Sequence, residues 1–207
     1  MSYKLSFLRN KLHSDKISRI PDYKGLRFKS PYTSWRPLLN IDNLTNIRYL
    51  EIGVSHGIHL FETAYAFPNA ELHGVDPWTD YAEYPEYKNQ QENTWNIFQS
   101  NLEICPDKHR IKIHRGFSDV IVPSFQDMSF DIIYVDGNHE AEYVYRDGCM
   151  AYRKLKSRGY IIFDDSDWET VAAGIRKFLD RYKHNLYVYA GVLDKDGNVC
   201  QFIVQKM

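Results

Sequence analysis

Residues 49–57 read Tyr-Leu-Glu-Ile-Gly-Val-Ser-His-Gly, and the rest of the chain repeats the kind of unit that this stretch begins. Its apolar half has the length of a buried strand, and Glu51 and Gly53 stand where that strand would end. A helix-like pattern starts at about Ile58, directly after Gly57. Strand, tight turn and helix is how α/β folds build ligand sites, because glycines admit a ligand close to the backbone and the helix start offers free N–H groups.

Apolar stretches and helix-like patterns alternate along the chain, and we predict a β-α order that occurs five times. The predicted strands cover residues 47–52, 71–75, 110–114, 130–135 and 160–163. The predicted helices cover residues 57–67, 88–103, 118–125, 140–156 (closed by Gly159) and 168–182. Two last strands, at 186–192 and 199–204, are joined around Asp194-Lys-Asp-Gly197, where Asp-Gly supplies a hairpin turn. This order predicts an α/β, Rossmann-like seven-stranded sheet, mostly parallel with a C-terminal antiparallel hairpin and helices on both faces.

The first 40 residues differ from the rest in charge. They hold nine Lys or Arg and two Asp, a net +7, and because the whole chain carries -1, the remaining residues carry -8. We expect residues 1–46 to form a basic extension of short helices, near 3–12 and 34–41, and loop. Residues 47–207 would form one domain. The extension could contact phosphate, an acidic partner or the acidic body of the chain, or pack across a homodimer.

The cysteines and the hydropathy of the chain favour a reducing compartment without a membrane. Cys105, Cys149 and Cys200 are far apart, odd in number and outside any CxxC pattern, which argues for a reducing compartment and against a zinc site. Charges interrupt the N-terminal residues too often for a signal peptide, and no apolar run is long enough to span a bilayer. We therefore expect a cytoplasmic protein without a membrane partner.

Acidic residues follow directly on the predicted strands: Glu51, Asp76, Asp136, Asp164 and Asp165. Ligands of parallel sheets bind beyond the C-terminal strand ends, near the point where the strand order reverses. These carboxylates are therefore expected to gather at one rim of the sheet.

The glycine-spaced turn resembles a known cofactor site. Glu51-x-Gly53-x-x-x-Gly57, with Asp76 at the second strand end, resembles the site of class I S-adenosylmethionine-dependent methyltransferases. The resemblance implies that Asp76 accepts hydrogen bonds from both ribose hydroxyls and that backbone at the two glycines lies against the methionine part. Ser55, at the middle position of the usual G-x-G-x-G, belongs to the same cofactor loop. Glu51 would orient this loop through its N–H groups or meet the ammonium group.

The resemblance implies two further cofactor contacts. Gly116, Phe117 and Ser118, after the third strand, would wall the adenine, although Ser118 could equally be a plain helix N-cap. Trp78 lies in the loop after the second strand and could form part of a lid over cofactor and acceptor. The same loop carries Tyr81, Tyr84 and Tyr87. Ordinary packing within the lid is the alternative for these aromatic residues.

The second half of the chain resembles a narrower group. Asp136-Gly-Asn-His139, with Asp164-Asp165 at the next strand end, is similar to the branch that contains the macrocin and mycinamicin sugar O-methyltransferases. The resemblance, which covers about residues 47–206, implies an Mg²⁺-like ion on Asp136, Asp164 and Asp165 that holds two substrate oxygens. Asp136 would also contact the cofactor, and His139 would remove the acceptor's proton. Helix capping by the paired aspartates and a loop hydrogen bond of His139 are left open.

We therefore expect an S-adenosylmethionine-dependent, metal-assisted O-methyltransferase that acts on a small hydroxylated acceptor such as a sugar. A nucleic-acid methyltransferase that grips with the basic arm is disfavoured by the acidic body and the lack of an Asn-Pro-Pro-Tyr-type motif. The strand-end acids argue against a non-catalytic cofactor-binding domain. A serine hydrolase built on Ser55 would need an Asp and a His late in the chain. The only histidine after the fifth strand is His184, at a predicted helix end far in sequence from a usable loop.

Overall fold

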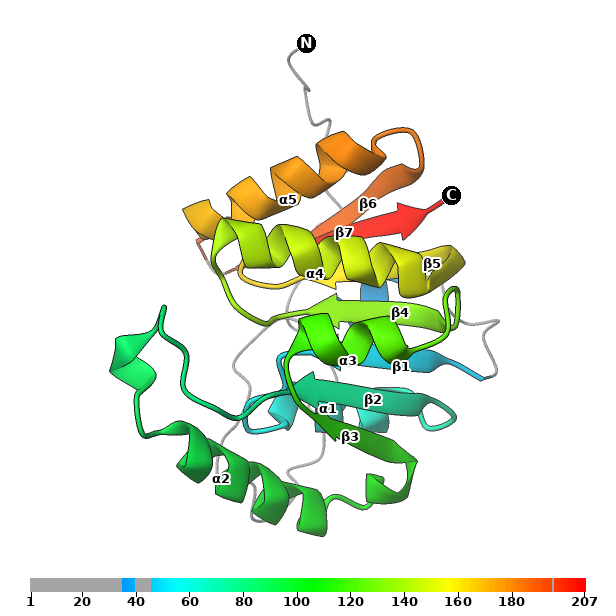
Figure 1. The fold of residues 1–207 in the computed structure, drawn as a ribbon. Coiled ribbons are helices and arrows are strands. Elements are labelled where there is room, and N and C mark those ends of the chain that lie inside the picture. The colour runs from blue at the N-terminus through cyan, green and yellow to red at the C-terminus, as the bar shows by residue number, and fades with distance from the viewer. Residues whose placement is uncertain (1–34, 40–45, 195) are drawn as a thin grey trace.

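The computed structural model describes residues 35–39, 46–194 and 196–207, in which strands and helices alternate (Figure 1). The strands are β1 (Arg48–Ile52), β2 (Glu71–Asp76), β3 (Ile111–Arg115), β4 (Phe130–Val135), β5 (Leu155–Phe163), β6 (Leu186–Leu193) and β7 (Val199–Lys206). The α-helices are α1 (Ile58–Ala66), α2 (Gln91–Ile104), α3 (Ser118–Ser124), α4 (Ala141–Lys154) and α5 (Glu169–Tyr182). Short 3₁₀ turns are η2 (Arg36–Leu38), η3 (Pro85–Tyr87) and η4 (Lys108–Arg110).

The seven strands form one sheet in the order β3-β2-β1-β4-β5-β7-β6. The pairs from β3 to β5 are parallel, and β7 runs antiparallel to both β5 and β6. The predicted Rossmann-like fold with a C-terminal hairpin is confirmed. The strand order reverses at β1, which lies between β2 and β4, so a crevice for a ligand is expected at the C-terminal ends of β1 and β4.

Apolar side chains fill both faces of the sheet. Successive residues of β1 point to opposite sides, so Tyr49 packs with the α1 and α2 residues Leu60 and Phe98, whereas Leu50 packs under α4 and α5. In Figure 1, α3, α4 and α5 lie in front of the sheet and α1 lies behind it. All six residues of β4 are buried, as expected of a central parallel strand. Within the described residues, every helix falls short of what crossing a bilayer would require.

Part of the segment before β1 packs into the core. Trp35 and Leu39 are buried in the cluster on the α1 face. The helix predicted near residues 34–41 is described only as the turn η2, and the helix predicted near residues 3–12 lies outside the described residues. The division of the chain at residue 46 stays a prediction.

One predicted boundary is wrong. Gly159 lies inside β5, which begins at Leu155 immediately after α4, and does not close the preceding helix. A Cβ atom at this glycine would lie 2.8 Å from the carbonyl oxygen of Asp131. The glycine therefore marks a close approach between two strands, a role that a sequence pattern alone does not separate from helix termination.

Candidate active site

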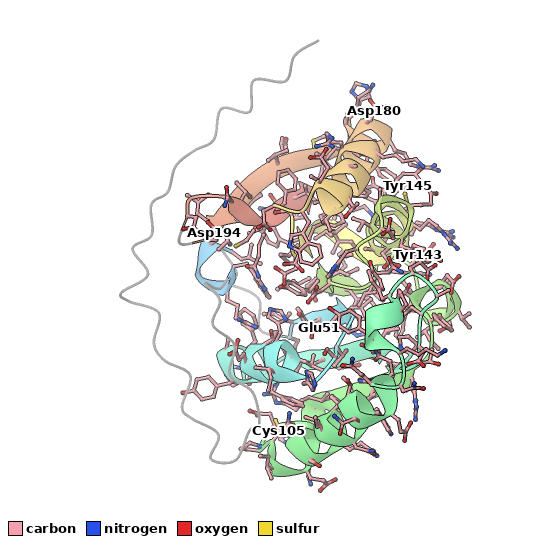
Figure 2. All side chains as sticks on the ribbon, turned by 90° about the vertical axis from the view of Figure 1, so that its left-hand side faces the viewer. Glu51, Cys105, Tyr143, Tyr145, Asp180 and Asp194 are labelled. Atoms are coloured by element: carbon pink, nitrogen blue, oxygen red, sulfur yellow. The ribbon has the colours of Figure 1, made fainter. Side chains whose placement is uncertain are left out.

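A cavity of about 480 Å³ opens beside the C-terminal ends of β1 and β4. Figure 2 looks onto this rim, with Glu51 near the centre of the view and Tyr143 on α4. The cavity is lined from β1, the loop after β2, the start of α3, the β4–α4 connection and α4. Its lining includes Gly53, Phe117, Ser118, Asn138, Tyr143 and Asp147.

Gly53 lets the end of β1 lie against the end of β4. Its φ is +88°, and a Cβ atom there would lie 1.8 Å from the carbonyl oxygen of Asp136, so only glycine fits. Gly57, with φ of +83°, lies against the rings of Phe61 and Phe98. Gly53 reaches the cavity, whereas the space beside Gly57 is filled by the core.

Asp76 holds the glycine loop. Its Oδ2 accepts hydrogen bonds from the N–H groups of Val54 and Ser55, each at 2.9 Å, and its Oδ1 accepts one from Trp78 N–H at 2.7 Å. Burial raises the pKa of this carboxyl, and the three N–H groups oppose the rise. Orienting the loop, one of the two roles predicted for Glu51, is performed here by Asp76. Its Oδ2 is occupied by two donors and its Oδ1 by one, so Oδ1 keeps one lone pair and the carboxylate can accept one further hydroxyl and not the two predicted.

Glu51 points to the α1 face and is 1% exposed. Its Oε2 accepts the Tyr49 hydroxyl at 2.7 Å and lies 2.7 Å from His59 Nδ1. Trp35 Nε1–H donates to His59 Nε2 at 3.1 Å, and since an indole only donates, the imidazole proton must sit on Nδ1 and face Glu51. Burial raises the pKa of Glu51 to about 8 and lowers that of His59 well below its usual value. Sequence reasoning missed His59, and its place in the first turn after Gly57 was the available signal.

Asp136, His139 and Asp165 form a second acidic group at the rim. His139 Nε2 lies 3.5 Å from Asp136 Oδ1 and 3.4 Å from Asp165 Oδ2. One ligand atom from each residue lies within 4.8 Å of the other two, close enough to share one ion. Burial and the neighbouring Asp164 raise the pKa of Asp136 well above its usual value, and burial raises that of Asp165 to about 7. A cation would relieve this repulsion.

Asp164 is not in the group that the structure brings together. Its carboxylate lies beside the buried Tyr134 hydroxyl. Burial raises the pKa of this hydroxyl, and the charge of Asp164 raises it further. Asp165 has a φ of +47°, so the chain turns at this point and the two neighbouring side chains point differently. Among the described residues, the groups that can share an ion are thus two aspartates and His139, and not the three aspartates that we predicted.

The loop between β2 and α2 closes one side of the cavity. Tyr84 receives a hydrogen bond from His139 N–H at 2.9 Å and donates one to Asn138 Oδ1 at 3.1 Å. Tyr143, on α4, donates to Glu83 at 2.7 Å. These contacts tie the loop to the β4–α4 connection and to the first turn of α4, as a lid would require.

Trp78 does not belong to this lid. The side chain is 1% exposed, packs against Trp95 and Phe98, and donates from Nε1 to the carbonyl oxygen of Ser55 at 2.9 Å. The predicted lid position is therefore wrong, because the residue turns inward and supports the glycine loop from the core. Its φ of +42° allows this turn.

The segment after β3 forms another wall of the cavity. The Phe117 ring, 46% exposed, meets Tyr81 edge-on at 6.0 Å. Ser118 is not the N-cap of α3, since Phe117 holds that position, and its hydroxyl donates to Asp147 Oδ1 at 2.7 Å. Burial raises the pKa of Asp147 to about 7. Gly116 packs against Ile121. Asp147 also lines the cavity, and we did not predict it as a site residue.

Known proteins resemble this chain in sequence and in fold. A protein of Acanthamoeba polyphaga mimivirus without a described function is 28% identical over 135 residues, 60% of this chain, and the chain spans 57% of that relative. The fold is similar to that of the O-methyltransferase TomG of Streptomyces achromogenes, involved in tomaymycin synthesis and solved with S-adenosylmethionine. For TomG the TM-score is 0.59 and the identity 16%, with 77% of this chain and 73% of that chain covered.

Two other solved structures share the fold. The O-methyltransferase of Bacillus cereus, solved with S-adenosylhomocysteine, has a TM-score of 0.60 and 15% identity over 77% of this chain and 74% of that one. The precorrin-6y C5,15-methyltransferase of Geobacter metallireducens has a TM-score of 0.56 and 16% identity over 79% of this chain and 81% of that one. The family model described as a methyltransferase domain matches residues 50–166, which is more than half of the chain. The chain therefore belongs to the methyltransferase domain family.

Proposed function

We propose that this protein is an S-adenosylmethionine-dependent O-methyltransferase that uses a divalent ion to methylate a small hydroxylated acceptor such as a sugar. The observation that carries the proposal is the 136–139 segment. Gly137 and Asn138 line the cavity at the reversal of strand order, while Asp136 and His139 turn to the group that could share an ion. Donor cavity and candidate ion site are thus adjacent.

The cavity suits an adenosine. Val75, Pro77 and the Phe117 ring offer apolar surface for a purine, and Ser118 and Asp147 offer polar groups for its edge. Its volume of about 480 Å³ lies within the usual range of about 300–1,000 Å³ for small-molecule sites. The Asp76 carboxylate and the loop with Ser55 lie at the adjoining end of β2.

The donor set of the second group suits a divalent ion. Carboxylates favour Mg²⁺ and Mn²⁺, and an imidazole extends the choice toward other transition metals. A neutral imidazole has one acceptor nitrogen, so His139 Nε2 can bind an ion or take a proton, but not both at once. We assign the ion to Asp136 and Asp165 and the proton to His139.

When bound, the donor supplies an activated methyl group, and the ion lowers the pKa of the acceptor hydroxyl. The chain supplies the rest. The β2–α2 loop, through Tyr81 and Tyr84, excludes water, and the rim orients acceptor and donor for in-line attack. His139 Nε2 accepts the hydroxyl proton as the new O–CH₃ bond forms and the S–CH₃ bond breaks, which leaves S-adenosylhomocysteine.

Two titrations test the proposal. Calorimetry with S-adenosylhomocysteine should show saturable binding, and no binding at millimolar ligand would overturn the donor assignment. Tb³⁺, as a probe for the ion site, should emit when Trp168 is excited, because this 49% exposed ring lies 4.9 Å from the His139 ring. Asp136→Asn should abolish emission and binding, and Trp168→Phe should abolish only emission. Asp180→Asn, an exposed carboxylate on α5, is the control.

A further inference from the structure

One residue that lines the cavity carries a buried hydrogen-bond donor without a partner among the described residues. Asn138 lines the cavity, and its Nδ2 is buried without a hydrogen-bond partner among the residues that the structure describes. Buried polar groups nearly always find partners, because an unpaired donor has lost its water and gained nothing in return. An unpaired donor at the edge of a ligand cavity indicates that the ligand provides the acceptor.

The orientation of this amide is fixed by its neighbours. Glu140 N–H lies 2.9 Å from Asn138 Oδ1, and a backbone N–H can only donate, so the atom facing it must be the carbonyl oxygen. The Tyr84 contact agrees with this orientation. Its oxygen accepts the His139 N–H, so its own proton is free to donate to Asn138 Oδ1. A flipped amide would place its NH₂ group against both donors, and Nδ2 is therefore the group left unpaired.

We infer that Asn138 Nδ2 donates a hydrogen bond to an acceptor atom of the adenosine moiety in the cavity, either a ring nitrogen of the adenine or a hydroxyl oxygen of the ribose. The inference rests on the proposed function and deepens it, because it makes Asn138 a binding residue. Tyr84 then has a second role besides closing the lid. Its hydroxyl holds the amide in the donating orientation, so closure of the loop prepares the contact.

The test compares Asn138→Asp with the wild type. Aspartate keeps an oxygen for the Glu140 and Tyr84 donors, removes the Nδ2 donor and adds one negative charge. Calorimetry should show S-adenosylhomocysteine binding weakened by about tenfold. Asn138→Ala, which adds no charge, should show a similar loss. Asn93→Asp adds the same charge at an exposed position of α2 and should leave the affinity unchanged.

Ligand analogues identify the acceptor. The 1-deaza, 3-deaza and 7-deaza forms of S-adenosylhomocysteine each lack one ring nitrogen, and the 2′-deoxy and 3′-deoxy forms each lack one ribose oxygen. The analogue without the acceptor should bind the wild type about tenfold more weakly than the parent. On each Asn138 variant, this analogue should have the same affinity as unmodified S-adenosylhomocysteine.

Two outcomes would overturn the inference while the proposed function stands. In the first, the wild type and both Asn138 variants bind S-adenosylhomocysteine equally. In the second, every analogue loses the same factor with all proteins. A wild type that binds no S-adenosylhomocysteine would remove the proposed function and the inference together.

Discussion

Two carboxylate–histidine groups lie at the same rim of the sheet and differ in almost everything but their chemistry. Glu51 and His59 are 2.7 Å apart, the carboxylate is 1% exposed, and the second imidazole nitrogen is taken by Trp35. In the other group, His139 lies 3.4–3.5 Å from two carboxylates whose side chains are about a third exposed. The first group meets its hydrogen-bonding needs internally. The second leaves spacing and access for an external ligand, so burial and spacing, and not residue type, separate the group that we propose to be reactive from the structural one.

The largest effect should come from Gly53, where the end of β1 that carries Glu51 contacts the backbone of Asp136. Gly53→Ala would force a Cβ atom to within 1.8 Å of the Asp136 carbonyl oxygen, at a φ of +88°. We expect a loss of roughly 3–5 kcal/mol in the free energy of unfolding, measured with urea. Gly197→Ala is the control, since it has the same φ of +88° and nothing within 4 Å, and should cost about 1 kcal/mol. Equal losses in the two variants would show that strand approach at Gly53 does not matter.

The buried group should govern part of the pH dependence of stability. The pKa of Glu51 is raised from 4.5 to about 8, so the folded state holds this proton more tightly than the unfolded state. The contribution of Glu51 is therefore fully present below pH 4.5 and is lost as the pH rises through about 8. Relative to Glu51→Gln, the wild type should lose roughly 2–4 kcal/mol across this range in urea unfolding. Parallel pH profiles for the two proteins would contradict this expectation.

The open group should respond to metal, and the buried group should not. Asp165→Asn is expected to weaken Mn²⁺ binding by roughly 100-fold in titration calorimetry, whereas Glu51→Gln should leave it unchanged. Burial holds the pKa of Asp165 at about 7, and only the ionised form binds metal, so wild-type affinity should rise between pH 6 and pH 8. A comparable loss in both variants would mean that the two groups act as one.

The smallest effect should come from one hydroxyl in the buried group. Tyr49→Phe keeps the ring and removes the hydrogen bond to Glu51, which should lower the free energy of unfolding by about 1 kcal/mol. It should also move the Glu51 pH transition upward, because that hydrogen bond lowers the pKa of the carboxyl. Tyr143→Phe removes an exposed hydroxyl–carboxylate contact and should change stability by less than about 0.5 kcal/mol. If the two variants matched, burial would not be the deciding factor.

The sequence predicted the sheet well because its strands carry strong local signals. The run at 130–135 is apolar except for Asp131, as expected of a central strand, and the Asp-Gly turn before β7 marked the hairpin. The acids at the strand ends were also predicted to gather at one rim, and the two carboxylate–histidine groups lie there. Each of these predictions depends on a local pattern, such as an acid or a turn that directly follows an apolar run.

The remaining features depend on contacts or on single backbone angles that a pattern does not encode. The aspartate that lies with Asp136 is Asp165 and not its neighbour Asp164, and Trp78 reads as a loop residue although it turns into the core. The Trp35–His59 hydrogen bond joins positions 24 residues apart, and no periodic sequence pattern predicts it. The sequence therefore predicted Asp136, His139 and Asp165 at one rim, but it did not separate Asp165 from Asp164 or the buried Trp78 from the lid.

The position of β7 has a consequence for how the protein is made. It is the seventh strand in chain order, yet it is inserted between β5 and β6 and pairs with both. Among the described strands, β5 therefore has an unpaired edge during synthesis until residues 199–206 leave the ribosome, and β6 has no described partner before then. Such edges are templates for aggregation, so the nascent chain should depend on chaperones strongly just before β7 emerges.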